Sequence, residues 1–262
     1  MSVPRPQSLG TSAAIAAWGA AYFGAGQMAG AMLDANPTAA AAVQAVIAEW
    51  GSGRLGVQWS DPEGPAQNAR SIARRAGLGA ALGIGAAALV LATTLVAHLS
   101  SLARNAPSIA SLGIGLLIAG LVAARDELLL HGVVLRMLQG TSVSGRLLAC
   151  GLTSAAASLG TATTTLPEAA ASGLCGMGVA ALWLLDRGAW MAWGARTAWL
   201  LGTGTLVHGG LLDVRAAATA WAGSDAGFSG GWCAVAVLGA LSAVALYLAK
   251  RRELRPSVPR TV

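Results

Sequence analysis

The stretch that organises the chain is RDELLLHGVVLR, residues Arg125–Arg136. It follows without interruption on the apolar run 107–124, which has the composition of a membrane-spanning helix. An isolated charge at the centre of a bilayer costs about 2.5–3.5 kcal/mol on insertion scales. Consecutive ionisable side chains at such a place therefore predict partners elsewhere in the chain that compensate for them.

The composition predicts an integral membrane protein. The 262 residues are 55% hydrophobic and only 11% charged, with a mean hydropathy of +0.62, whereas soluble domains carry about 25% charged residues. The net charge of +6 is scattered over short loops and the tail, a pattern of membrane orientation that predicts no nucleic-acid partner. The three cysteines are far apart and form no metal-ligand spacing, so we expect neither a metal nor another cofactor.

Apolar runs separated by turns predict an all-α, polytopic bundle of about seven transmembrane helices. The segment 38–50 is predicted to be an interfacial helix and 51–70 a loop. The run 107–138 is too long for an untilted span, so we expect it to tilt or to break near Gly132. A signal peptide is the alternative for the first run, which we prefer as a retained span. The predicted spans are 12–33, 76–99, 107–138, 147–164, 168–185, 190–212 and 233–249.

We divide the chain into an N-terminal part (1–75: span, interfacial helix and loop), a membrane domain (76–250) and a basic tail (251–262). With the C-terminus in the cytoplasm, twelve of the 17 basic residues lie inside and two lie within spans. This asymmetry follows the positive-inside rule and predicts a protein of the cell (inner) membrane, with the bilayer as its first partner. The three basic residues expected outside are Arg5, Arg104 and Arg215.

The ionisable residues within the predicted spans are expected to face the bundle interior and to meet one another. Glu127 and His131 are four residues apart and share a helix face. Arg196, from the sixth span, is the expected counter-charge for Asp126 or Glu127. Two interpretations stay open: an ion-pair network that fixes helix register without chemistry, and a carboxylate that activates water with the help of a histidine. The residues concerned are Arg125, Asp126, Glu127, His131 and Arg196, with His208 near the end of the sixth span.

The motif Asp126-Glu127-x-x-x-His131-Gly132 resembles the Glu-Glu-x-x-x-Arg-Gly motif of the CAAX protease and bacteriocin-processing (CPBP, or Abi) family of intramembrane peptidases. The segment 188–200 resembles the later motif of that family, in which a tryptophan precedes a run ending in His-x-x-x-Asn. The resemblance covers about residues 76–250. It implies a CPBP core in which Glu127, Asp126, His131 and Arg196 occupy the catalytic positions. In the family, the glutamate pair and two histidines activate water, and the asparagine supports the oxyanion.

The departures from that pattern imply a degraded catalytic site. Arg196 and Leu200 stand where the later motif has its histidine and asparagine, and no histidine lies between His131 and His208, although the second motif would place one near 155–164. A guanidinium cannot act as a base. We therefore expect a pseudoprotease that binds a membrane-embedded peptide or a partner protein.

Two alternatives stay open. The first is an active glutamate-type intramembrane endopeptidase that cleaves leader segments or C-terminal sorting segments, with His131 and His208 carrying protons. The second is a component of a transporter or channel in which the charged cluster relays protons.

Overall fold

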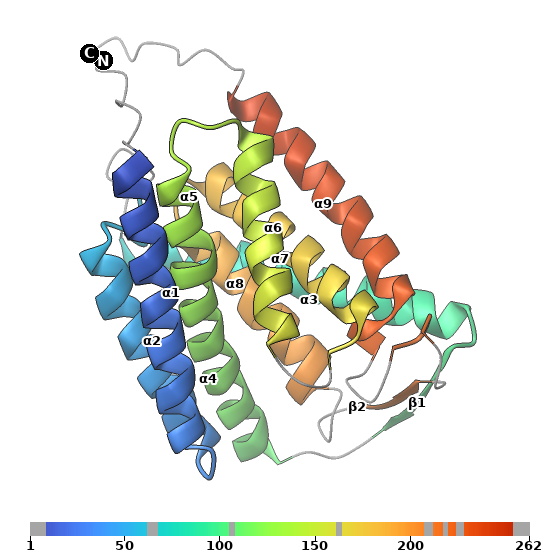
Figure 1. The fold of residues 1–262 in the computed structure, drawn as a ribbon. Helices are drawn as coiled ribbons and strands as arrows, with labels where there is room; N and C mark the ends of the chain where they lie inside the picture. The colour runs from blue at the N-terminus through green and yellow to red at the C-terminus, as the bar shows by residue number, and fades with distance from the viewer. Residues whose placement is uncertain are drawn as a thin grey trace.

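The computed structural model describes residues 9–61, 68–104, 108–160, 164–206, 212–216, 220–223 and 228–253. The described chain is almost entirely helical, with one small antiparallel sheet (Figure 1). The elements are α1 (Leu9–Met32), α2 (Pro37–Arg54), α3 (Ala69–Val96), β1 (Ser100–Arg104), α4 (Ile109–Asp126), η1 (Glu127–Gly132), α5 (Val133–Met137), α6 (Val143–Leu159), α7 (Leu166–Asp186), α8 (Ala189–Leu200), η2 (Leu201–Thr205), β2 (Leu212–Ala216), η3 (Phe228–Gly230) and α9 (Trp232–Glu253).

Within the described residues, four helical segments are long and apolar enough to cross a membrane: Ala69–Val96, Ile109–Met137, Leu166–Asp186 and Trp232–Glu253. Only 17–44% of their most apolar windows is buried inside the protein. So much uncovered apolar surface is stable in a bilayer and would aggregate in water. The chain is thus an integral membrane protein with an all-helical bundle. The helix α6 is apolar but one residue short of a span of 18.

The helix expected over 107–138 runs continuously over Ile109–Met137 and changes geometry where a break was predicted. The segment Glu127–Gly132 is a π-helical turn, a form that is rare and concentrates at functional sites. The turn ends at Gly132, where a larger residue does not fit because its Cβ would lie 2.6 Å from Val57 and 2.8 Å from Trp183. The helix therefore does not break near Gly132 but continues there through a π turn.

The sixth predicted span is shorter than expected. The helix that begins at Ala189 continues through the π turn η2 and ends at Thr205, and Leu212 belongs to β2. This strand pairs antiparallel with β1, with Leu102 opposite Val214. The apolar pattern does not distinguish a short strand from the end of a helix, so this boundary was wrong. The helix α9 also passes its expected stop at 249 and reaches Glu253, because basic residues are favourable in the last turn of a helix.

The N-terminal helices form a hairpin, side by side in Figure 1, that packs against α4. The Ser12 hydroxyl at the start of α1 donates to the Met137 carbonyl at 3.2 Å, and Gly56, just after α2, lies against Arg136. The start of α1 therefore lies at the Arg136 end of the bundle, not at the opposite end as expected. The difference arises because α2 has 18 residues, about 27 Å of helix, and packs along α1 and α4 where an interfacial helix was predicted.

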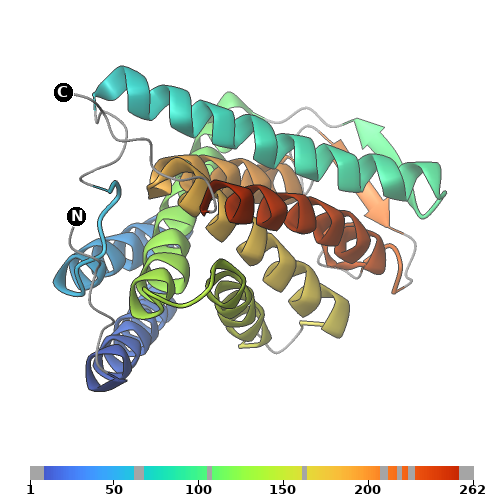
Figure 2. The same ribbon diagram turned by 90° about the horizontal axis from the view of Figure 1, so that it is seen from above.

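The helix α8 packs very closely on α3. A Cβ at Gly79 would lie 1.9 Å from the Met191 carbonyl oxygen, and one at Gly83 would lie 2.1 Å from that of Ala195. Small residues four apart are the usual means of bringing membrane helices into backbone contact. Seen from above, α3 lies on the side of the bundle away from the α1–α2 hairpin, and α8 packs against both α3 and α4 (Figure 2). This packing carries Arg196 of α8 into the interior of the bundle.

A buried ion pair joins the start of α3 to the end of α7. Arg75 Nε donates to Asp186 Oδ1 at 2.7 Å and to Oδ2 at 2.8 Å. Both side chains are about 95% buried, at 4% and 5% exposure. The same carboxylate accepts a hydrogen bond from the Met191 backbone N–H at 3.2 Å. One aspartate therefore fixes three helices at this end of the bundle.

Candidate functional site

The predicted site residues come together in the bundle interior. Asp126 ends α4, Glu127 and His131 lie on the π turn η1, and Arg196 lies on α8. Glu127 is 0% exposed, His131 1% and Asp126 3%. Buried charges at such depth are stable only when they are paired, and the pairs divide into two groups.

The first group surrounds Asp126 with two guanidinium groups. Arg125 donates to Asp126 Oδ1 from Nε at 2.9 Å and from Nη2 at 2.6 Å, and Arg196 Nη2 donates to Oδ2 at 3.2 Å. The expected pairing of Arg196 with Asp126 is confirmed. Arg125 also donates to the Gln44 side chain of α2 and lies over the Phe23 ring of α1. The N-terminal hairpin therefore helps to hold the cluster.

The second group is a line of three side chains. His131 Nδ1 lies 3.1 Å from Glu127 Oε1, within ion-pair distance but out of line for a hydrogen bond. The other ring nitrogen, Nε2, lies 3.0 Å from the hydroxyl oxygen of Ser154 on α6. Glu127 and His131 do share a face, as expected. The sequence interpretation missed Ser154, which lies just before the segment 155–164 where the resemblance places a histidine.

Arg196 of α8 links α4 to α7. Its Nη1 donates to Cys175 Sγ of α7 at 3.3 Å, and Cys175 is at the same time a buried residue of the hydrophobic core. One turn earlier on α8, Trp193 Nε1 donates to the Gly120 carbonyl of α4 at 2.8 Å. This bond ties α8 to α4 beside the contact between Arg196 and Asp126.

A polar cavity of about 470 Å³ opens beside the cluster. Pockets that bind small molecules or peptide segments have volumes of about 300–1,000 Å³. Glu127 and His131 do not line this cavity, whereas Asp126 and Ser154 do. Its walls come from α1, the α4–η1 helix, α6, α7 and α8, and comprise Phe23, Gln27, Arg125, Asp126, Leu130, Ser154, Ala157, Ser158, Gly160, Ser172 and Arg196.

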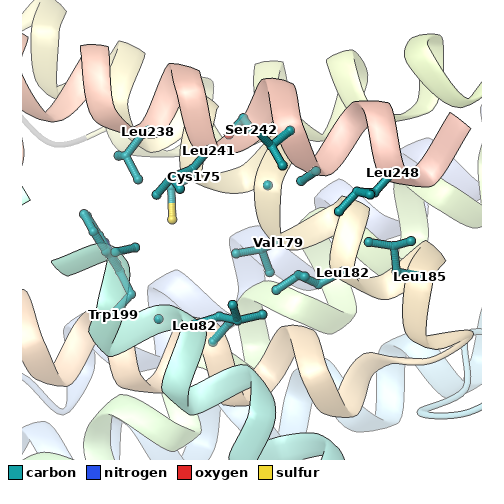
Figure 3. Close-up of a pocket in the computed structure, with 16 residues that line it drawn as sticks. Leu82, Cys175, Val179, Leu182, Leu185, Trp199, Leu238, Leu241, Ser242 and Leu248 are labelled. Atoms are coloured by element: carbon teal, nitrogen blue, oxygen red, sulfur yellow. The ribbon is translucent and has the colours of Figure 1, made fainter. Parts of the chain in front are cut away.

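A second cavity, of about 230 Å³, is lined almost entirely by apolar side chains of α3, α7, α8 and α9 (Figure 3). Leu82, Val179 and Leu238 are among its walls, and none of its lining residues is charged. Cys175 borders this cavity while its sulfur accepts the bond from Arg196. Besides this thiol, the residues that line the apolar cavity include no charged or titratable side chain.

The sequence has two histidines besides His131. His208 lies outside the described residues. His98 is exposed in the turn after α3, where its backbone has a φ of 56°, as suits an ordinary residue at a span end. No group of three or more histidine, cysteine, aspartate or glutamate side chains in the described part of the chain could hold a metal ion.

These features define a class: an all-helical integral membrane protein with a buried polar site beside a cavity. No protein-family model, no curated protein and no solved structure matches the chain.

Proposed function

We propose that the chain is a CPBP-like membrane protein in which the glutamate-type peptidase route has been lost and the polar cavity binds a membrane-embedded peptide segment. One observation carries the proposal: Arg196, where the resembled motif has a histidine, is bound to Asp126. A guanidinium stays protonated in proteins and cannot accept the proton of an attacking water.

The surroundings of the two carboxylates support the loss of that route. Both oxygens of Asp126 accept hydrogen bonds from arginines, so this carboxylate is already engaged. Glu127 is fully buried and does not line the cavity. A water molecule in the cavity would meet Asp126 and two guanidinium groups, but not the glutamate that should activate it. A general base has to lie within hydrogen-bond reach of the proton that it removes.

The cavity walls support binding of a peptide whose helix is interrupted. Backbone N–H and C=O groups that are unpaired within a bilayer each cost several kcal/mol. The Gln27 amide offers a donor and an acceptor to such groups and the Ser172 hydroxyl oxygen offers an acceptor, while Phe23 and Leu130 offer apolar contact. An unbroken helix satisfies its own backbone and gains less from these walls.

The orientation with the C-terminus in the cytoplasm is part of the proposal. A cleft at one end of the bundle is lined by Arg136, Arg146 and Arg187, and Arg146 is paired with Glu253 near the end of α9. Grouping of these arginines at one end agrees with the positive-inside rule.

A photo-crosslinking amino acid at Ala157 tests the binding proposal. Ala157 lines the cavity, whereas the control position, Leu116 on α4, is 51% exposed on the apolar outer surface. In vesicles, we expect Ala157 to crosslink a 20-residue apolar peptide with a central Gly-Pro, and not an uninterrupted Leu/Ala helix of the same length, while Leu116 does not distinguish them. Mass spectrometry of the adducts is the readout.

Equal adducts of both peptides at Ala157 would contradict the proposal, because a surface that meets peptides only by diffusion in the bilayer has no preference for an interrupted helix.

A further inference from the structure

The line Glu127–His131–Ser154 is used by neither the ion-pair network nor the binding proposal. We propose that Ser154 is a nucleophile, with His131 as its general base and Glu127 as the carboxylate that compensates the charge on the imidazole, and that it cleaves a peptide bond of a segment held in the cavity. The choice of substrate rests on the proposed function, whereas the chemistry rests on the geometry of these three side chains.

The Ser154 hydroxyl differs from those of its neighbours on α6. Thr153 donates to the Cys150 carbonyl at 2.9 Å and Ser158 donates to that of Ala155 at 2.7 Å, as hydroxyls within helices commonly do. The Ser154 hydroxyl instead meets an imidazole at 3.0 Å. Gly176 on α7 makes this possible, because a Cβ there would lie 2.2 Å from Ser154 Oγ.

The imidazole presents Nε2 to the hydroxyl that it would deprotonate, and its Nδ1 lies beside a carboxylate. The carboxylate of Glu127 beside Nδ1 favours the tautomer with a proton on that nitrogen, which leaves Nε2 able to accept the Ser154 proton. The pair Glu127–His131 is buried at 0% and 1% exposure. In the described part of the chain, neither Glu127 oxygen has a hydrogen-bond donor, so the positive charge that forms on the imidazole during the reaction would be met by this carboxylate.

The cavity that Ser154 lines also has a hydrogen-bond donor for the oxyanion, the guanidinium of Arg196. Ser154 and Arg196 both line it. Arg196 Nη1 and Nη2 each use one N–H on Cys175 and Asp126 and keep a second N–H for the oxyanion, whereas Nε is buried and does not face the cavity. A fixed N–H donor in a site with little water stabilises a developing oxyanion strongly. The arginine that blocks the glutamate route is therefore suited to this second role.

The reaction balances without a metal or a redox partner. Ser154 Oγ attacks the peptide carbonyl carbon while its proton passes to His131 Nε2, and the tetrahedral oxyanion forms next to Arg196. The C–N bond then breaks, and the leaving amine takes the proton from Nε2. Water attacks the acyl–Ser154 ester, gives one proton to Nε2, and releases a carboxylic acid; Ser154 recovers the proton.

Labelling with an alkyl fluorophosphonate tests the nucleophile without a peptide substrate. In lipid nanodiscs, Ser154 Oγ should displace fluoride and give a phosphonate ester, found by mass spectrometry on the tryptic fragment that contains Ser154. We expect Ser154→Ala to abolish labelling and His131→Gln to slow it by about 10²–10⁴-fold, the range of a general base. Gly176→Ala should also slow it, because the new Cβ displaces the hydroxyl.

Thr153→Val is the matched control, because within the described residues the Thr153 hydroxyl donates to the Leu130 and Cys150 carbonyls and not to the imidazole, and it should label at the wild-type rate. Absence of label at Ser154 in the folded wild-type protein would overturn the proposal, and this readout does not depend on whether any variant folds. Label at Ser154 without a crosslinking preference for interrupted peptides at Ala157 would support the nucleophile and contradict the binding proposal. A crosslinking preference at Ala157 without label at Ser154 would support the binding proposal and contradict the nucleophile.

Discussion

Asp126→Asn is expected to lower the free energy of unfolding by about 3–5 kcal/mol, the usual loss when one partner of a buried ion pair is removed. The substitution preserves shape but removes the charge that both Arg125 and Arg196 contact at 2.6–3.2 Å. Two guanidinium groups, each with a side chain only 14% exposed, then remain without their carboxylate. Reversible denaturation in detergent micelles, followed by tryptophan fluorescence, measures the loss.

A second substitution separates this network from general damage. In the Asp126→Asn background, Arg196→Leu removes one of the uncompensated charges and should recover part of the lost stability, which a double-mutant cycle measures as coupling. Asp213→Asn is the control, because its pair with Arg215 is exposed at 44% and 77% and exposed pairs contribute at most about 1 kcal/mol. Additive losses in the cycle would show that Asp126 and Arg196 do not act as a pair.

Arg75→Ala is expected to have an effect of similar size. It leaves Asp186, 5% exposed, as a buried carboxylate without its bidentate partner, again a loss of about 3–5 kcal/mol. Because Asp186 also accepts from the Met191 N–H, the start of α8 should loosen as well. The midpoint of thermal unfolding gives the size of the loss, and amide hydrogen exchange over 189–195 shows where it acts.

The pair Arg187–Asp61 provides the matched control at the same end of the bundle. Both of its side chains are 39% exposed, so Asp61→Asn should cost at most about 1 kcal/mol. A loss as large as that of Arg75→Ala would show that burial does not govern these pairs. Replacement of Arg75 and Asp186 together by Met and Leu should be milder than Arg75→Ala alone, because no buried charge is then left unpaired.

The sequence predicted the parts of the site that follow from the cost of burying charge. That cost required a partner for Asp126, and Arg196 is that partner. The spacing of Glu127 and His131 placed them on one face, which the structure confirms at 3.1 Å. The length of the run 107–138 predicted a tilt or a break near Gly132, whereas the helix continues through the π turn η1.

The contact of Ser154 with His131 could not be predicted from the sequence, because Thr153 and Ser158 carry similar hydroxyl groups on the same helix. Only the packing of α6 against η1 and α7 decides which hydroxyl meets the imidazole, through the space that Gly176 leaves. Packing of this kind depends on residues far apart in the chain. The pairing of β1 with β2, between segments more than 100 positions apart, was missed for the same reason.

The length of α2 was misjudged for a local reason. Gly51 and Gly53 indicated a loop, since glycine is unfavourable within helices. In the structure both are helical, and a Cβ at Gly51 would lie 2.5 Å from the Tyr22 ring. Close packing of α1 on α2 thus requires glycine at this position and overrides its low helix propensity. Because α2 was predicted too short, the start of α1 was predicted at the wrong end of the bundle.

Cleavage of peptides with an interrupted helix, measured in proteoliposomes, distinguishes the glutamate-type route from chemistry that belongs to Ser154. Wild type, Glu127→Gln and Ser154→Ala are compared at equal amounts of folded protein, with cleavage products identified by mass spectrometry. Because the glutamate-type route is lost, we expect the Ser154→Ala variant to cleave none of the peptides. Cleavage that continues at the wild-type rate in Ser154→Ala and stops in Glu127→Gln would contradict this expectation, because the glutamate would then activate water without the serine.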